Sequence, residues 1–251
     1  MENKKIIYYK QIDSTNTELA RLAMKGAEHG TVVVAESQSA GKGRRGRQWE
    51  SPAGENIYMS ILLRPDCAPD LAPMLTLVMA YSVGEALKAL GFLEVQIKWP
   101  NDLVLSSKKI CGILTEMQLK DSEIDYVVVG VGINVNTSRF PEELQDTATS
   151  LYLESGTILD REKLVESIAK YFDKSYRKFL ETQDLSFLKE AYNDMLVNVG
   201  REVRVLEPGN EYTAYARGIN ASGELLVRTA GGEEKRIYAG EVSVRGIYGY
   251  V

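Results

Sequence analysis

"EVQIKWPNDLVLSSKKICGILTEMQLKDSEIDYVVVGVGINVN", residues 94–136, predicts the central part of a β-sheet. Apolar and β-branched runs alternate in it with short groups of Pro, Asn, Asp and Ser, which is typical of strands joined by turns. The expected strands cover residues 94–99, 103–106, 109–119 and 125–136. A helix-starting Rossmann loop at Gly130-x-Gly132 is excluded, because the third glycine and a following helix are missing. Glycines inside a strand indicate a close approach to the backbone instead, here by a ligand.

The chain before and after this stretch reads as further strands and helices. Additional strands are expected at residues 6–12, 31–37 and 56–64, and helices at 14–27, 71–91, about 160–182 and about 185–197. The helix at 71–91 is long and apolar, so it is expected in the core. Thr15-x-x-Glu18 fits a capping box at the first helix.

The texture of the sequence changes after Val199. Short alternating runs there are cut by Pro-Gly, Ser-Gly and Gly-Gly turns, which predicts a small all-β unit, a sandwich or a barrel. We therefore expect an α/β domain over residues 1–198 and a small β domain over residues 199–251.

Composition excludes several classes of function. The net charge of −5 over 251 residues argues against general affinity for nucleic acid or anionic membranes. A single histidine and two distant cysteines make a His/Cys zinc site and a Ser–His–Asp triad poor candidates. The chain shows no signal peptide and no membrane span, and two cysteines make no disulfide framework. A cytoplasmic location is expected.

The segment "GKGRRGRQW", residues 41–49, concentrates four cations among three glycines. Flexible glycine backbone can present consecutive N–H groups to an anion, and arginine adds bidentate hydrogen bonds to phosphate or carboxylate. A solvated surface loop and a nucleic-acid patch are the alternatives. The acids Glu36 and Glu50 on either side disfavour the patch, since such patches usually have wider basic surroundings.

Two other segments place polar groups at the ends of expected strands. In "KWPND", residues 98–102, a rigid turn carries Lys98, Asn101 and Asp102. Lys108 and Lys109 follow as neighbours in a strand, so at most one of them faces a given pocket. "DSTN", residues 13–16, lies at a strand-to-helix junction, where N-capping is the simple interpretation.

Taken together and in this order, "DSTN", "QSAGKGRRGRQW", "KWPNDLVLSSKKICGILTE" and "GVGINVN" resemble the biotin–protein ligases, and the resemblance covers essentially the whole chain. It implies an α+β fold: a mixed-sheet catalytic domain related to class II aminoacyl-tRNA synthetases, with a small C-terminal SH3-like β-barrel. It also implies that biotin and ATP, with Mg²⁺, form biotinyl-5′-AMP, and that biotin then passes to a lysine of a biotin carboxyl carrier domain.

The resemblance also implies roles for individual residues. Biotin contacts fall on Ser14, Thr15, Asn16, Gln38, Lys42, Gly43, Arg44, Lys109, Gly112 and Gly130. Nucleotide contacts fall on Arg44, Arg45, Arg47, Trp49, Asn101, Lys109 and Asn134, the last reaching the adenine. Catalysis falls on Lys109, Arg44 and Asp102. No metal ligands are assigned.

This sequence departs from the family in two places. Members commonly read G-R-G-R-R-G where this chain has Lys42, which keeps the charge but loses the planar fork. Lys42→Arg is therefore expected to change affinity only modestly. The first expected strand begins near Ile6, so we expect no N-terminal DNA-binding domain and no operator binding. The resemblance allows either a monomer or a homodimer.

Three other functions are alternatives to the ligase that the resemblance implies. "GKGRRGRQW" and "KWPND" together disfavour a lipoate–protein ligase or another acyl-adenylate transferase. The negative net charge and the balanced charge of the β unit disfavour a nucleic-acid module. A biotin-storage protein without catalysis is a minor alternative.

Overall fold

The computed structural model describes residues 5–207, 209–238, 243–246 and 250. A seven-stranded mixed sheet with the order β1-β2-β3-β7-β6-β5-β4 forms its larger part. The strands are β1 (Ile6–Ile12), β2 (Val32–Gln38), β3 (Ile57–Leu63), β4 (Gln96–Lys98), β5 (Asp102–Leu105), β6 (Lys108–Lys120) and β7 (Glu123–Ile133). Only the β1–β2 pair of this sheet is parallel. The four strands expected in residues 94–136 are confirmed as β4 to β7.

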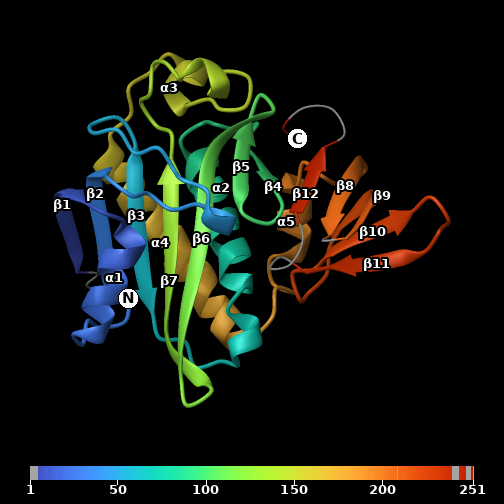
Figure 1. Ribbon diagram of the computed structural model, residues 1–251, viewed down its shortest axis with the longest axis horizontal. Coiled ribbons are helices and arrows are strands. Elements are labelled where there is room, and N and C mark those ends of the chain that lie inside the picture. The colour runs from blue at the N-terminus through green and yellow to red at the C-terminus, as the bar shows by residue number, and fades with distance from the viewer. Residues whose placement is uncertain (1–4, 208, 239–242, 247–249, 251) are drawn as a thin grey trace.

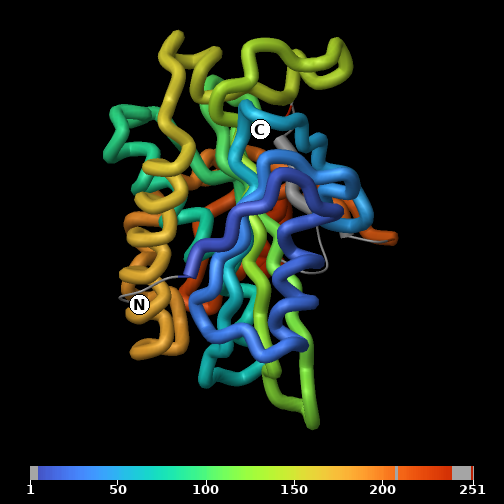
Figure 2. Tube along the Cα trace, turned by 90° about the vertical axis from the view of Figure 1, so that its left-hand side faces the viewer, coloured from blue at the N-terminus to red at the C-terminus, as the bar shows by residue number. Residues whose placement is uncertain are grey.

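Helices cover both faces of this sheet (Figures 1 and 2). The helix α1 (Thr15–Met24) provides the crossover that the parallel β1–β2 pair requires, and it covers one face. The helices α2 (Met74–Ala89) and α4 (Arg161–Thr182) pack together against the other face. Every residue of β3 is buried, because this strand lies between the two layers and has no solvent side.

Alternation along the strands divides the core into two clusters. Val33 and Leu62 pack with Leu19 of α1 in the smaller cluster. Val32 and Ile61 belong to the larger cluster, with α2 and α4. Successive side chains of a strand point to opposite faces, so the apolar runs noted in the sequence serve both layers.

A second sheet begins after the α/β part, as the short alternating runs and turn residues after Val199 predict. Its strands are β8 (Glu202–Glu207), β9 (Asn210–Ile219), β10 (Leu225–Thr229), β11 (Glu234–Ile237) and β12 (Ser243–Gly246). They follow the order β11-β10-β9-β8-β12, and all neighbours are antiparallel. This is the small SH3-like β unit. The helix α5 (Lys189–Met195) precedes it in the chain.

Trp99 joins the two sheets. Its side chain is fully buried, and its indole Nε1 donates a hydrogen bond of 3.1 Å to the carbonyl of Gly223, in the turn before β10. Its backbone N–H donates to Asn198 Oδ1 at 3.0 Å. Nearby, Asn193 Oδ1 accepts from the Ile219 backbone N–H at 2.8 Å. The "KWPND" turn is therefore held from the C-terminal side by buried hydrogen bonds.

Two local expectations were wrong or incomplete. The capping box is wrong: Ser14, at the N-cap of α1, makes no side-chain cap bond, Thr15 bonds Gln38, and Glu18 bonds Tyr9 and Arg21. Tertiary partners for these side chains replace the local cap. The short helix α3 (Leu151–Ser155) was missed, since five residues carry too little periodicity to be recognised.

Cys111 has the environment expected of a small core residue. Cys111 is fully buried, and burial raises the pKa of its thiol above the ordinary range, as expected of a small core residue. Within the described part of the chain, no helix combines the length and the apolar character needed to cross a bilayer.

Replacing Trp99 by Phe should destabilise the protein. We expect Trp99→Phe to lower the free energy of unfolding by about 2–3 kcal/mol, because it leaves a small cavity and an unpaired Gly223 carbonyl. Urea unfolding followed by circular dichroism measures this. The exposed Tyr215 offers a control, and Tyr215→Phe should change stability by less than about 0.5 kcal/mol. Equal effects of the two variants would contradict the role of Trp99.

Candidate active site

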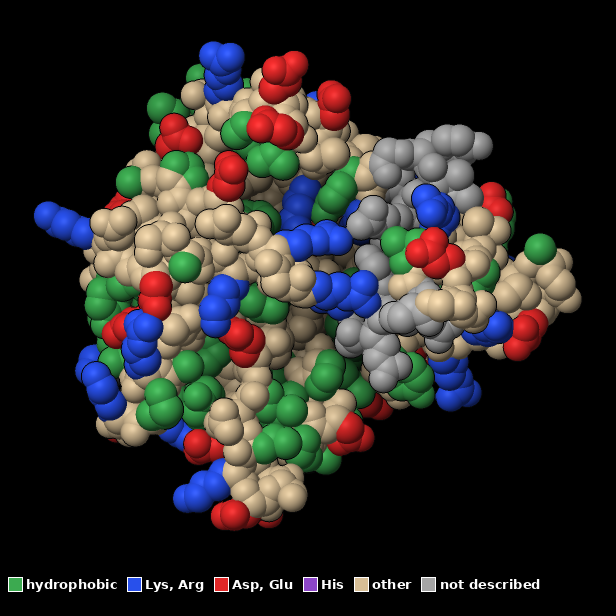
Figure 3. Space-filling model, viewed as in Figure 1, with side chains coloured by type: hydrophobic (Ala, Val, Ile, Leu, Met, Phe, Trp, Pro, Cys, Tyr) green, Lys and Arg blue, Asp and Glu red, His purple; other side chains and the backbone are tan. Residues whose placement is uncertain are grey.

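One cavity lies where the start of α1, the segment after β2, and strands β6 and β7 meet. Its lining residues are Ser14, Thr15, Asn16, Gln38, Lys42, Gly43, Arg44, Trp49, Asn101, Lys109, Gly112, Ile113, Leu114, Gly130, Val131 and Gly132. Most of the residues that the resemblance implies are thus brought together from distant parts of the sequence. On this face of the molecule, Lys and Arg side chains gather beside a central hollow (Figure 3).

Glycines form the floor of the cavity. Gly112 of β6 and Gly132 of β7 are direct partners in the sheet. Two residues further along, on the same face, Gly130 pairs with Leu114. A Cβ atom on Gly130 would lie 2.0 Å from Asn16 Oδ1, and one on Gly132 would lie 2.6 Å from Trp49 Nε1. The close approach expected at these glycines is therefore made in this structure by Asn16 and Trp49.

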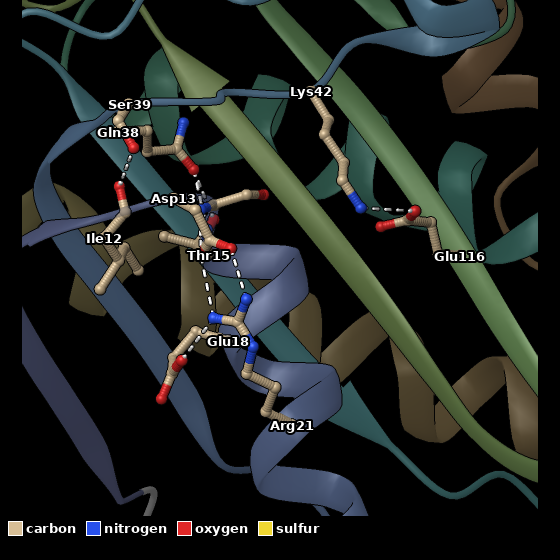
Figure 4. A network of polar contacts seen from close by, with 10 residues as sticks. Ile12, Asp13, Thr15, Glu18, Arg21, Gln38, Ser39, Lys42 and Glu116 are labelled. Carbon is tan, nitrogen blue, oxygen red and sulfur yellow. Dashed lines mark hydrogen bonds and ion pairs between the residues drawn. The ribbon is translucent and has the colours of Figure 1, made fainter.

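A polar wall stands beside the floor at the beginning of α1. Gln38 Oε1 accepts from the Thr15 backbone N–H at 2.8 Å and from its hydroxyl at 3.2 Å, and the two side chains point toward each other in Figure 4. The Ser60 hydroxyl lies 2.8 Å from Thr15 Oγ1 and 2.6 Å from Asn16 Oδ1. Ser14, Thr15 and Asn16 are all buried. Small polar groups are thus fixed by hydrogen bonds along one wall of the cavity.

The basic segment folds over the cavity as a narrow loop. Lys42 and Gln48 form an antiparallel bridge, and the Gly43 N–H donates to the Arg47 carbonyl at 2.7 Å. Between them, Arg45 has a positive φ of 57° at the tip. Arg45 and Arg47 are exposed, and neither lines this cavity. The loop therefore presents Lys42 and Arg44 inward and the other two cations outward.

Arg44 is the most buried cation of the loop. Its Nη1 donates to Asn101 Oδ1 at 2.8 Å, which ties the loop to the "KWPND" turn. Burial lowers the pKa of the Arg44 guanidinium from its usual value, the Asp102 charge opposes this, and Arg45 and Arg47 add to it. An arginine remains charged under physiological conditions, so Arg44 supplies a partly desolvated positive charge.

Lys109 provides a second cation opposite the polar wall. Its Nζ lies 2.7 Å from Asp102 Oδ1 and 5.2 Å from the centre of the Trp49 ring. Asn101 Nδ2 donates to the same Asp102 oxygen at 3.1 Å. Lys108 turns away and donates to the Gln145 carbonyl at 2.7 Å. The expectation that only one of the two adjacent lysines faces the pocket is confirmed.

Tyr250, after the last strand of the second sheet, also reaches this region. Its hydroxyl donates to Asp102 Oδ2, and its carbonyl accepts from Lys98 Nζ. The same ammonium lies 3.5 Å from the centre of the Tyr250 ring, a cation–π contact. Asp102 thus has a partner on each carboxylate oxygen. No motif in the sequence pointed to Tyr250, because its contact spans 148 residues.

Asn134 is not brought to the cavity. It is buried at the end of β7, where its Nδ2 donates to the Thr149 carbonyl at 3.1 Å, and it is absent from the cavity lining. Its contact with adenine stays a prediction. Sequence reasoning also missed Leu114, which alternation from Gly112 could have placed on the same face of the strand. Ile113 and Val131 also border the cavity, but they alternate with the floor glycines and belong to the core on the side of α2 and α4. Sequence reasoning missed Glu116 as well, which bonds Asn16 and Lys42.

Among the described residues, no group of three or more His, Cys, Asp or Glu side chains could hold a metal ion. Asp102, beside the cavity, already pairs with Lys109. Mg²⁺ commonly binds through substrate phosphates and water with one or two carboxylates. The residues present therefore fit a magnesium ion that arrives with a nucleotide rather than one held in a protein cage.

Comparisons with known proteins match both parts of the chain. Residues 8–134 match the biotin/lipoate A/B protein ligase family, and residues 199–245 match the biotin protein ligase C-terminal domain. The bifunctional ligase/repressor BirA of Bacillus spizizenii is 38% identical over 95% of this chain and 74% of its own length. The biotin–[acetyl-CoA-carboxylase] ligase of Paracoccus denitrificans is 32% identical over 88% of this chain and 93% of its own.

Solved structures agree with this match. The biotin protein ligase of Aquifex aeolicus in complex with biotin and ATP superposes with a TM-score of 0.85 at 35% identity, over 97% of this chain and all of that chain. The apo structure of the same enzyme superposes with a TM-score of 0.81 at 31% identity. Together with the two matched domains, these relatives show that the chain belongs to the biotin/lipoate A/B protein ligase family.

Proposed function

We propose that the chain is a biotin–protein ligase. The carboxylate of biotin attacks the α-phosphate of ATP, the bond to pyrophosphate breaks, and biotinyl-5′-AMP forms. A lysine amine of a biotin carboxyl carrier domain then attacks the biotinyl carbonyl, and AMP leaves. The observation that carries this proposal is one cavity with a small polar wall on one side and the cations Arg44 and Lys109 on the other.

The polar wall and the floor suit the head of biotin. Its fused rings are apolar apart from a ureido group, so they need apolar surface with a few fixed hydrogen-bonding groups. Leu114, on the same face of β6 as Gly112, supplies apolar surface, and Ser14, Thr15, Asn16 and Gln38 supply the polar groups. Gly112 and Gly130 carry no side chain, so they leave space for the rings above the strands. Lys42 and Gly43 complete this part of the site from the loop.

The cations suit the chemistry of adenylation. Two anions, a carboxylate and a phosphate, must be brought together, and charge builds up as the bond to pyrophosphate breaks. Lys109 and Arg44 stabilise this charge, since preorganised charges in a partly desolvated site act strongly on a transition state. Asp102 positions Lys109 through their 2.7 Å contact, and in the second step it is placed to hold the attacking amine. Mg²⁺ would screen the phosphates of ATP.

The nucleotide is assigned to the side of the cavity nearest the "KWPND" turn. Trp49 and Asn101 line the cavity there, with Lys109 and Arg44. Arg45 and Arg47 lie on the outer side of the loop, where they would meet the phosphates only after the loop moves. These assignments follow the family resemblance, and the relatives named above support them because one was solved with biotin and ATP.

Location, domain division and assembly complete the proposal. The free thiols of Cys67 and Cys111 support a cytoplasmic enzyme. The matches at residues 8–134 and 199–245 support a catalytic domain over 1–198 and a C-terminal domain over 199–251.

A homodimer through a sheet edge, which the resemblance allows, would use β1, because contacts of β4 with Leu196 and Val197 cover the other edge. Analytical ultracentrifugation tests this.

The function is tested by mass spectrometry of a purified carrier domain after incubation with the protein, biotin and MgATP. We expect one lysine to gain one biotinyl group, and lipoic acid in place of biotin to give none. Lys109→Met should slow pyrophosphate release by about a hundredfold or more. Lys108→Met is the matched control, because this lysine points away from the cavity. An unlabelled carrier domain with the wild-type protein would disprove the proposal.

The glycine floor gives a second test. Gly130→Ala should weaken biotin binding at least about tenfold, because overpacking typically costs about 1–3 kcal/mol and the new methyl group would displace Asn16. Isothermal titration calorimetry measures the affinity. Gly231→Ala is the control, since a Cβ there meets nothing closer than 3.9 Å. Unchanged affinity in Gly130→Ala would remove Asn16 and Gly130 from the biotin site.

We also propose that this chain does not bind operator DNA. Its net charge is −5, and Lys42 and Arg44 of its basic loop are directed at the cavity. In a gel-shift assay with biotin and ATP present, a biotin-operon promoter fragment should migrate unchanged at physiological salt. Specific retardation of that fragment, but not of a scrambled sequence, would overturn this proposal.

A further inference from the structure

Glu116 stands at the outer edge of the cavity on β6, and its two carboxylate oxygens have different partners. Oε2 accepts from Asn16 Nδ2 at 2.7 Å, and Oε1 lies 3.4 Å from Lys42 Nζ. Figure 4 shows Lys42 reaching down from the loop toward Glu116. One carboxylate therefore joins the polar wall of the cavity to the loop that covers it, although its partners lie 100 and 74 residues away in sequence.

The contact with Asn16 fixes the orientation of a buried amide. Asn16 is 4% exposed, and its Nδ2 donates to the Leu114 carbonyl at 3.2 Å as well as to Glu116. Its Oδ1 accepts from the Ser60 hydroxyl at 2.6 Å. An amide whose two N–H groups and oxygen all have partners has one stable orientation. Without the carboxylate, one N–H of a buried group would lose its acceptor.

The contact with Lys42 holds the loop at its base. Lys42 is the residue at which the loop begins to close on itself, through its bridge to Gln48. Its side chain and that of Glu116 are 46% and 43% exposed. Exposed ion pairs of this kind change an equilibrium by about fivefold at most. The contact is thus strong enough to shift how often the loop is closed, and too weak to decide whether the protein folds.

We propose that Glu116 is a positioning residue for biotin activation, which orients Asn16 in the biotin wall and holds Lys42 so that the loop covers the bound acid. This inference rests on the proposed function. Glu116 does not line the cavity, so it acts through its two neighbours and not on the reacting atoms. Its loss should therefore raise the KM for biotin and leave kcat for pyrophosphate release within about twofold, as expected for uniform binding energy.

Four variants separate the two contacts. Glu116→Gln keeps an oxygen that can accept from Asn16 but removes the charge that faces Lys42. Glu116→Ala removes both contacts. Lys42→Met removes the charged partner on the loop, and Lys42→Arg keeps its charge. Glu123→Gln is the control for removing an acid from the same hairpin, because Glu123 begins β7, away from the cavity, and its side chain makes no hydrogen bond or ion pair with the described residues.

Initial rates of pyrophosphate release over a range of biotin concentrations give KM and kcat for each variant. Glu116→Gln and Lys42→Met should each raise the KM by about two- to fivefold. Their double mutant should raise the KM no more than Lys42→Met alone does, since the contact with Glu116 is already lost in that variant. Glu116→Ala should raise the KM further, by about tenfold or more, because the buried Asn16 also loses an acceptor. Lys42→Arg should raise it less than Lys42→Met does.

Three results would overturn the proposal. An unchanged KM in Glu116→Ala would make Glu116 an ordinary surface group. If the increases in KM of Glu116→Gln and Lys42→Met multiplied in the double mutant, Glu116 would not act through Lys42. A loss of kcat without a change in KM would place Glu116 in the chemistry itself. If Glu116→Ala fails to fold by circular dichroism, Glu116→Gln and Lys42→Met still decide the question. Failure of the wild-type protein to release pyrophosphate would instead refute the proposed function.

Discussion

The site depends on bare backbone at three neighbouring positions of the sheet. Gly112, Gly130 and Gly132 leave the face of β6 and β7 without side chains, so Asn16 and Trp49 rest directly on the strands. Any larger residue would push one of these two side chains outward. The polar wall, the loop and the cations are all arranged around this low floor. The positions of the polar and charged groups therefore depend on the packing of Asn16 and Trp49 against these glycines.

Charge in the cavity is arranged as paired groups. Lys109 contacts Asp102, Lys42 contacts Glu116, and Arg44 donates to the Asn101 amide. Each cation is thus fixed in place by an oxygen of the protein, which spares the cost of ordering a long side chain when a substrate binds. An incoming anion competes with these oxygens, so its affinity reflects the difference between two sets of contacts. Of these pairs, Lys109–Asp102 is the shortest, and it is less exposed than Lys42–Glu116.

Much of the fold followed from the sequence, because period and composition are local. The strands of residues 94–136, the apolar helix α2 and the small β unit were all predicted from such patterns. Lys108 and Lys109 were correctly separated by alternation alone. The cavity lining could be named only through family motifs, since the sequence does not show which distant segments meet. Glu116 and Tyr250 were missed because their partners are set by tertiary contacts.

The bond from Trp99 to Gly223 has a consequence for how the protein is made. The tryptophan leaves the ribosome 124 residues before its partner carbonyl does. Domains tend to fold from the N-terminus during synthesis, and their exposed apolar surface is then open to aggregation. Here the indole of Trp99, beside the "KWPND" turn, has no partner carbonyl from Gly223 until the second sheet has emerged. The "KWPND" turn of a nascent chain thus lacks one of its buried hydrogen bonds until the segment that carries Gly223 has been made.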